Sequence, residues 1–155
     1  MPEFYWPIRI YYEDTDCGGV VYHANYLRFF ERARTEWLRK LGFEQDRLLQ
    51  QYGVVFAVRS IHIDFLQAAV FNQLLWVSTD LLEIGKASLS ITQKLLCIPE
   101  LRWDAFQDSI ARVRIPQEVT PLCSAHVKIA CLDQGAFKPR PIPKTIVEEI
   151  SRARC

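Results

Sequence analysis

The chain contains no run of about 18–20 apolar residues, which is the length that a membrane-spanning helix needs. It also has no basic leader ahead of an apolar stretch, as a secretory signal would show. An excess of one charge is absent too, since 19 Lys and Arg stand against 18 Asp and Glu. This balance argues against a broad nucleic-acid-binding surface, which would be strongly basic. We therefore expect a cytoplasmic protein that neither spans a membrane nor binds nucleic acid.

Cysteine and histidine lack the spacing that metal sites and disulfide frameworks require. The five cysteines are an odd number and form no C-x-x-C pair, which favours reduced thiols. The three histidines form no H-x-x-x-H or H-E-x-x-H motif. We predict no metal site and no redox cofactor.

The first half of the chain reads as a strand followed by helices. Half of the 155 residues are hydrophobic, so we expect one domain spanning 1–155. Aromatic and β-branched residues in Tyr5–Tyr12 predict a first strand. From Asn25, apolar residues recur every three or four positions, which predicts a long amphipathic helix ending near Gly42. Charged residues, Arg34 among them, are expected on its exposed face. A short second helix is predicted over Glu44–Gly53.

Later segments alternate apolar and polar residues, which is the period of a half-buried strand. Their short connections favour antiparallel neighbours. The pattern predicts an α+β architecture in which an antiparallel sheet of about five strands wraps around one long helix. An exposed sheet edge in so small a unit invites pairing with a second copy. The alternating segments are Ser60–Phe65, Leu74–Ile84, Ala87–Thr92 and Ser124–Cys131.

Two segments near the end of the chain depart from this alternation. Leu101–Pro121 interrupts it, and we interpret this stretch as an insertion between two strands. Pro143 suits the first turn of a final short helix.

Two acids precede a double glycine in the stretch "DTDCGG". Asp14 or Asp16 could cap a turn or helix, as Asp commonly does. Alternatively, a strand that extended to Asp16 would direct both carboxylates to one side. Glycines would let the backbone turn closely, and the helix beginning near His23 would offer free N–H groups to a developing anion. A carboxylate facing such a helix end suits acyl transfer.

Other nucleophile and base combinations are weaker. Ser60, His62 and Asp64 face one side of a strand, but same-face neighbours are about 6.8 Å apart along it. That separation argues against a catalytic triad. Cys17 and His23 could form a nucleophile–base pair, although a small turn residue explains Cys17 adequately.

The stretch "YYEDTDCGGVVYHANYLRFFERARTEWLRKLGF" resembles the opening of the hotdog-fold acyl-CoA thioesterases of the 4-hydroxybenzoyl-CoA thioesterase class, and is most similar to the branch associated with the Tol–Pal system. "FAVRSIHIDFLQAA" and "KPRPIPKTIV" continue the resemblance. It implies a hotdog fold with active sites at a dimer interface, in a homodimer or homotetramer. It assigns the catalytic carboxylate, as nucleophile or general base, to Asp16 and the oxyanion contact to the backbone N–H of His23. Gly19 and Tyr22 would line the same pocket.

The resemblance implies hydrolysis of a small or medium acyl-CoA, with an acyl-carrier protein as an alternative donor. Coenzyme A carries phosphates, and the candidate basic contacts are Arg59, Lys138, Arg140 and Lys144. Two other functions stay open. A hotdog hydratase or dehydratase would need an acid–base pair, for which Asp16 and His23 are the nearby groups. A non-catalytic module would bind acyl-CoA or an acyl carrier without cleaving it.

Overall fold

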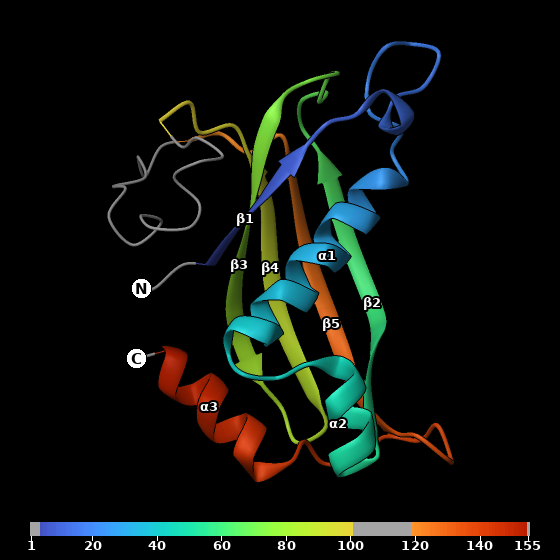
Figure 1. Ribbon diagram of the computed structural model, residues 1–155, viewed down its shortest axis with the longest axis vertical. Coiled ribbons are helices and arrows are strands. Elements are labelled where there is room, and N and C mark those ends of the chain that lie inside the picture. The colour runs from blue at the N-terminus through green and yellow to red at the C-terminus, as the bar shows by residue number, and fades with distance from the viewer. Residues whose placement is uncertain (1–3, 101–118, 155) are drawn as a thin grey trace.

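The computed structural model describes residues 4–100 and 119–154 (Figure 1). No helix in these two ranges is long and apolar enough to cross a membrane. The elements are β1 (Phe4–Arg9), a 3-10 turn η1 (Tyr12–Asp14), α1 (Asn25–Lys40), α2 (Gln45–Tyr52), β2 (Val54–Phe65), β3 (Leu74–Ile84), β4 (Ser88–Leu96), β5 (Cys123–Asp133) and α3 (Lys144–Arg154).

The strands form one antiparallel sheet in the order β1-β3-β4-β5-β2. The expectation that strands joined by short connections pair is confirmed for β3 and β4 but is wrong for β2 and β3, which lie apart. Instead β2 pairs with β5, so that Phe65 lies opposite Cys123 and Val54 lies opposite Asp133. The 12-residue strand β2 is therefore one edge of the sheet.

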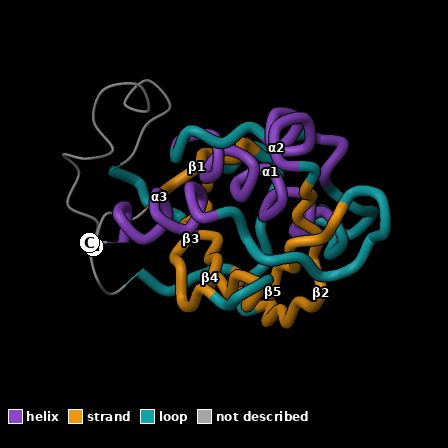
Figure 2. The backbone as a smooth tube through the Cα atoms, turned by 90° about the horizontal axis from the view of Figure 1, so that it is seen from below, coloured by secondary structure: helices purple, strands orange, loops and turns teal. Residues whose placement is uncertain are grey.

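The helices lie on one side of the sheet, and α1 crosses its face (Figures 1 and 2). This arrangement follows from the sequence, because α1 has one apolar stripe and the sheet has one apolar face, and each buries the other. The predicted α+β architecture is confirmed. The contact between the two layers is made by side chains with at most 2% exposure, among them Phe29, Phe30, Ala33, Leu75, Val77, Ile91, Ala125 and Val127.

Glycines end the first two helices where the sequence predicts. Gly42 follows α1 with φ of +95°, and Gly53 follows α2 with φ of +65°. Both values lie in the left-handed region, which glycine adopts without a steric penalty. The final helix, α3, begins directly after Pro143, as expected.

A buried polar group joins α1 to the sheet. Arg34, 8% exposed, donates from Nη1 to Gln93 Oε1 at 3.0 Å. Gln93 is fully buried on β4, and its Nε2 donates at 3.0 Å to both Thr79 Oγ1 and the carbonyl oxygen of Phe30. The expectation that Arg34 lies on the exposed face of the helix is wrong, because a residue four positions after Phe30 shares its buried face.

A second apolar cluster, of Tyr5, Trp76, Leu96 and Ile98, is separate from the main core, and Val119 packs against it. Val119 is the first described residue after the gap in the described chain. The insertion predicted over Leu101–Pro121 therefore lies mostly outside the described residues.

Candidate active site

The carboxylate of Asp14 closes a turn. The first strand ends at Arg9, and the 3-10 turn η1 follows. Asp14 Oδ2 accepts the backbone N–H of Tyr11 at 2.8 Å, which holds this turn closed. The conditional prediction that a strand reaches Asp16 and directs both acids to one side is therefore wrong. For Asp14 the capping interpretation is correct.

Asp16 lies at the tip of a tight loop. Its backbone N–H donates to the carbonyl of Val20 at 2.9 Å, and its Oδ1 accepts the N–H of Gly18 at 2.8 Å. Gly19 has φ of +80°, which L side chains rarely adopt. A Cβ on Gly18 would lie 3.1 Å from Asp16 Oδ1, tighter than an ordinary contact. The double glycine thus permits both the turn and the close approach of backbone to carboxylate, and Asp16 itself stays exposed.

The start of α1 is fastened to this loop. The N–H of Tyr22 donates to the carbonyl of Asp14 at 2.9 Å, and Asn25 Nδ2 donates to the same oxygen at 2.9 Å. Within the described part of the chain, no acceptor bonds the N–H of His23 or that of Ala24. These free donors lie at the positive end of the helix dipole, where an anion is stabilised. The structure therefore places two free N–H donors at the helix start next to the Asp16 loop.

An open hollow of about 520 Å³ borders this helix start. Its walls include His23, Tyr26 and Phe65, and the ring centroids of Tyr26 and Phe65 are 5.3 Å apart. Tyr22 lies beside the hollow, with its ring centroid 4.6 Å from that of His23. The hollow has aromatic side chains on one side. It is open to solvent, so this chain alone does not exclude water from it.

Three of the four predicted phosphate contacts lie at the other end of the molecule (Figure 1). Arg140 Nη1 donates to the carbonyl of Tyr52 at 2.8 Å and lies 3.4 Å from Asp133 Oδ1, so it supports the end of α2. Lys138 and Lys144 lie in the same region, in the connection from β5 to α3 and at the start of α3. In one subunit these side chains are thus far from Asp16.

Arg59 lies between the two ends, at an irregularity in the pairing of β2 with β5. Its side chain is exposed on the edge strand.

The outer face of the sheet carries the two remaining histidines. His62 Nε2 lies 3.3 Å from Asp64 Oδ2, although both are mostly exposed. The spacing argument against contact along the strand is therefore wrong for this pair, because both side chains lean toward each other. His126 lies opposite His62, and its Nδ1 is 3.4 Å from Thr92 Oγ1. These residues alternate with the core-facing ones, so they lie on the sheet face away from α1 and take no part in the site at its start.

The cysteines divide by burial. Cys17 and Cys97 are exposed, whereas Cys123 and Cys131 are buried. Burial raises the pKa of the Cys123 thiol to about 12. In the described residues no contact joins Cys17 to His23.

The antiparallel sheet that wraps around one long helix, with its carboxylate loop at the helix start, is a hotdog fold. Residues 11–150 match the thioesterase-like superfamily. The acyl-CoA thioesterase YbgC of Haemophilus influenzae is 41% identical over 143 residues, which cover 92% of this chain and 90% of the relative. The acyl-CoA thioester hydrolase YbgC of Escherichia coli is 38% identical over 149 residues, which cover 96% of each. The chain belongs to the thioesterase-like superfamily.

Solved structures agree on the fold. A mutant of 4-hydroxybenzoyl-CoA thioesterase, complexed with 4-hydroxybenzoyl-CoA, has a TM-score of 0.76 at 17% identity. The match covers 96% of this chain and 99% of that one. The predicted hotdog fold and kinship with acyl-CoA thioesterases are confirmed.

Proposed function

We propose that the protein hydrolyses acyl-CoA thioesters, with Asp16 as nucleophile or general base and the N–H of His23 as an oxyanion donor. Relatives that are 41% and 38% identical are named acyl-CoA thioesterase and acyl-CoA thioester hydrolase. The observation that carries the proposal is the free N–H of His23 at the start of α1, fastened to the loop that presents Asp16.

The chemistry follows from these two groups. The thioester carbonyl oxygen accepts the N–H of His23, which stabilises the negative charge of the tetrahedral intermediate. Asp16 either attacks the carbonyl carbon, forming an anhydride that water then cleaves, or takes a proton from an attacking water. The carbon–sulfur bond breaks, coenzyme A leaves as its thiol after gaining a proton, and the acyl group leaves as a carboxylic acid.

The exposed edge of β2 supports a dimer. This strand is 12 residues long, and the described part of the sheet ends with it. Long bare edges are normally covered, and a second copy covers this one when the two β2 strands pair antiparallel about a twofold axis. Val58 and Phe65 on this strand are about half exposed, at 47% and 52%, and such pairing would bury them.

Such pairing also explains the distribution of charge. Antiparallel strands related by a twofold axis bring the Val54 end of one next to the Phe65 end of the other. The Phe65 end carries His23, with ring centroids 6.4 Å apart, and the Val54 end carries Arg140. The partner subunit's Lys138 and Arg140 would then lie beside the Asp16 loop, where the phosphates of coenzyme A need cations.

The activity is tested by incubating the purified protein with a saturated acyl-CoA and measuring free thiol with a colorimetric reagent. Hydrolysis predicts one thiol released for each acid formed. Tight binding without thiol release would instead identify a binding module. Turnover of an enoyl-CoA without thiol release would identify a hydratase. Parallel assays with acyl-carrier protein thioesters identify the preferred donor.

The charge contacts are tested by Lys138→Ala. We expect KM for acyl-CoA to rise while kcat stays near the parental value, because the lost contact is to a group that does not react. An acyl-N-acetylcysteamine thioester, which has no phosphates, is the matched control and should be cleaved by both proteins with equal kcat/KM. An equal loss on both substrates would contradict a phosphate contact.

A further inference from the structure

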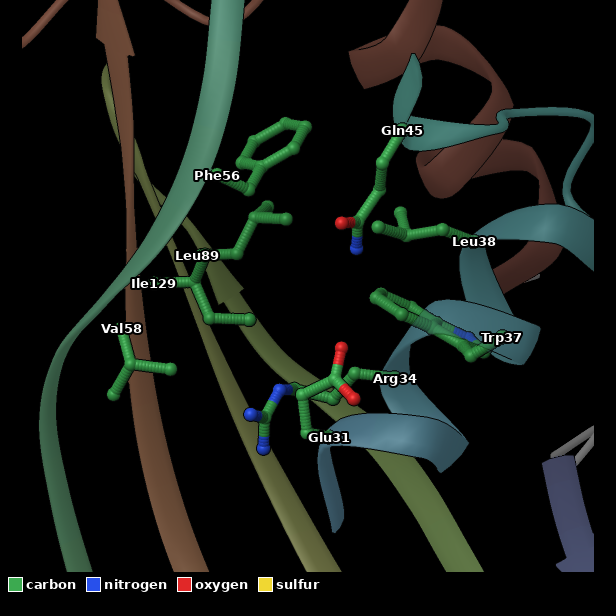
Figure 3. Close-up of a pocket in the computed structure, with 9 residues that line it drawn as sticks. All are labelled: Glu31, Arg34, Trp37, Leu38, Gln45, Phe56, Val58, Leu89 and Ile129. Atoms are coloured by element: carbon green, nitrogen blue, oxygen red, sulfur yellow. The ribbon is translucent and has the colours of Figure 1, made fainter. Parts of the chain in front are cut away.

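A cavity beside the second half of α1 extends the space available to a substrate. It is an open-mouthed hollow between α1 and the strands β2, β4 and β5, of about 500 Å³ when the open solvent at its mouth is counted (Figure 3). Apolar side chains such as Trp37, Phe56 and Val58 line the side of the strands and the end of α1, and the polar side chains of Glu31 and Gln45 also line it. Arg34 is the cationic exception, and it reaches from α1 toward the strands across one side of the cavity (Figure 3). A concave space that offers apolar walls beside a small number of polar groups suits the binding of a small organic group.

The guanidinium of Arg34 is held in place but only partly satisfied. It has five N–H donors. Within the described residues it makes one hydrogen bond, to the buried amide of Gln93. Burial lowers the pKa of Arg34, and the nearby carboxylate of Glu31 acts in the opposite direction. Its remaining donors therefore need water or another acceptor in the cavity.

The proposed dimer, in which the two β2 strands pair, places this cavity next to the Asp16 loop of the other copy. Phe56 and Val58 belong to the Val54 half of β2, which antiparallel pairing brings close to the Phe65 end of the partner. The partner subunit's His23 borders that end. A thioester bound there with its carbonyl at the partner subunit's His23 would extend its acyl group into this cavity.

We propose that Arg34 sets the maximum acyl length of the substrate, an inference that rests on the proposed thioesterase function. Each methylene placed against the apolar wall raises the affinity about fourfold. A chain long enough to reach Arg34 displaces water from its free donors and offers no acceptor in return, which lowers affinity about tenfold. Specificity therefore rises with chain length to a maximum and falls beyond it.

The test measures kcat/KM on acetyl-, butyryl-, hexanoyl-, octanoyl- and decanoyl-CoA. Arg34→Met keeps the length of the side chain and removes its donors. We expect the ratio of kcat/KM for decanoyl-CoA to that for butyryl-CoA to rise about tenfold. The exposed Arg32→Met is the matched control and should keep the parental profile. A purely structural role of Arg34 would reduce all five values by a similar factor and leave the ratio unchanged, which would overturn the proposal.

A second variant decides the question should Arg34→Met not fold. Gln45, exposed on α2, points toward the cavity (Figure 3), lies away from the β2 edge and tolerates a larger side chain more readily than a core position. Gln45→Phe reduces the space in the cavity from the α2 side, so the optimum should move to shorter chains. An unchanged optimum would show that the acyl group does not enter this cavity. Either failure leaves Asp16-dependent thiol release intact, whereas failure of the proposed function abolishes thiol release from every acyl-CoA.

Discussion

Replacing Gln93 with Leu should destabilise the protein strongly. Gln93 is fully buried and makes three hydrogen bonds, of which one accepts from the guanidinium of Arg34. Losing the only described acceptor of a buried cation costs about 1.5–3 kcal/mol. Losing the donor to Thr79 costs about 1 kcal/mol more. The carbonyl of Phe30 keeps its helical bond, so it adds little.

Together these losses predict that the free energy of unfolding falls by about 2.5–4 kcal/mol. At about 2–4 °C per kcal/mol for a chain of this size, Tm should fall by about 5–16 °C. Urea titration and calorimetry at one fixed protein concentration measure both quantities, since oligomers unfold in a concentration-dependent manner. The exposed Gln51→Leu is the control and should stay within about 0.5 kcal/mol of the parent. A loss below about 1 kcal/mol in Gln93→Leu would refute the reasoning that this polar group fastens α1 to the sheet.

Two further predictions concern the loop and the thiols. Gly19→Ala should lower the free energy of unfolding by about 1 kcal/mol and reduce kcat/KM, because φ of +80° strains an L side chain and moves the Asp16 loop. Gly135 has no positive φ, so Gly135→Ala is the control and should change neither quantity. Equal effects of the two substitutions would contradict this explanation. With iodoacetamide at pH 8, peptide mass spectrometry should find Cys17 labelled and Cys123 unlabelled in the native protein, because the raised pKa keeps the buried thiol protonated. Rapid native labelling of Cys123 would contradict its burial.

Local patterns predict the elements of this fold well. The apolar period from Asn25 and the stop at Gly42 define α1, because a helix needs one buried stripe and a residue that tolerates the left-handed region. Alternation finds the later strands, although it underestimates β2, which begins at Val54. Residues near the start of β2 are apolar on both faces, and alternation does not detect such a stretch.

Tertiary contacts explain what sequence could not predict. The position of β2 at the sheet edge depends on which strands meet across the sheet, and no local period records that. Arg34 carries a charge that favours solvent, but its position four residues after Phe30 puts it on the buried face, and Gln93 supplies a partner from β4. An inward-facing glutamine in an otherwise apolar strand face was the available signal.

In the candidate site, too, local sequence patterns predict some residues, whereas the roles of others depend on tertiary contacts. A short motif predicts Asp16 and His23 as site residues, and the structure brings the Asp16 loop and the helix start together. The role of Asp14 depends on whether the strand continues, and it ends at Arg9. Lys138 could not be placed from sequence, because its distance to the Asp16 loop would depend on the proposed pairing of two copies of the chain.

The role of Asp16 is tested by measuring kcat of Asp16→Asn on a saturated acyl-CoA, followed by thiol release. General-base or nucleophilic assistance predicts a loss of about a hundredfold or more, with circular dichroism and oligomer mass unchanged. Asp14→Asn is the matched control, because its amide oxygen can still accept the N–H of Tyr11 and should preserve turnover. If Asp16→Asn released thiol at the parental rate, Asp16 would not be the catalytic carboxylate, and the account of this site would be wrong.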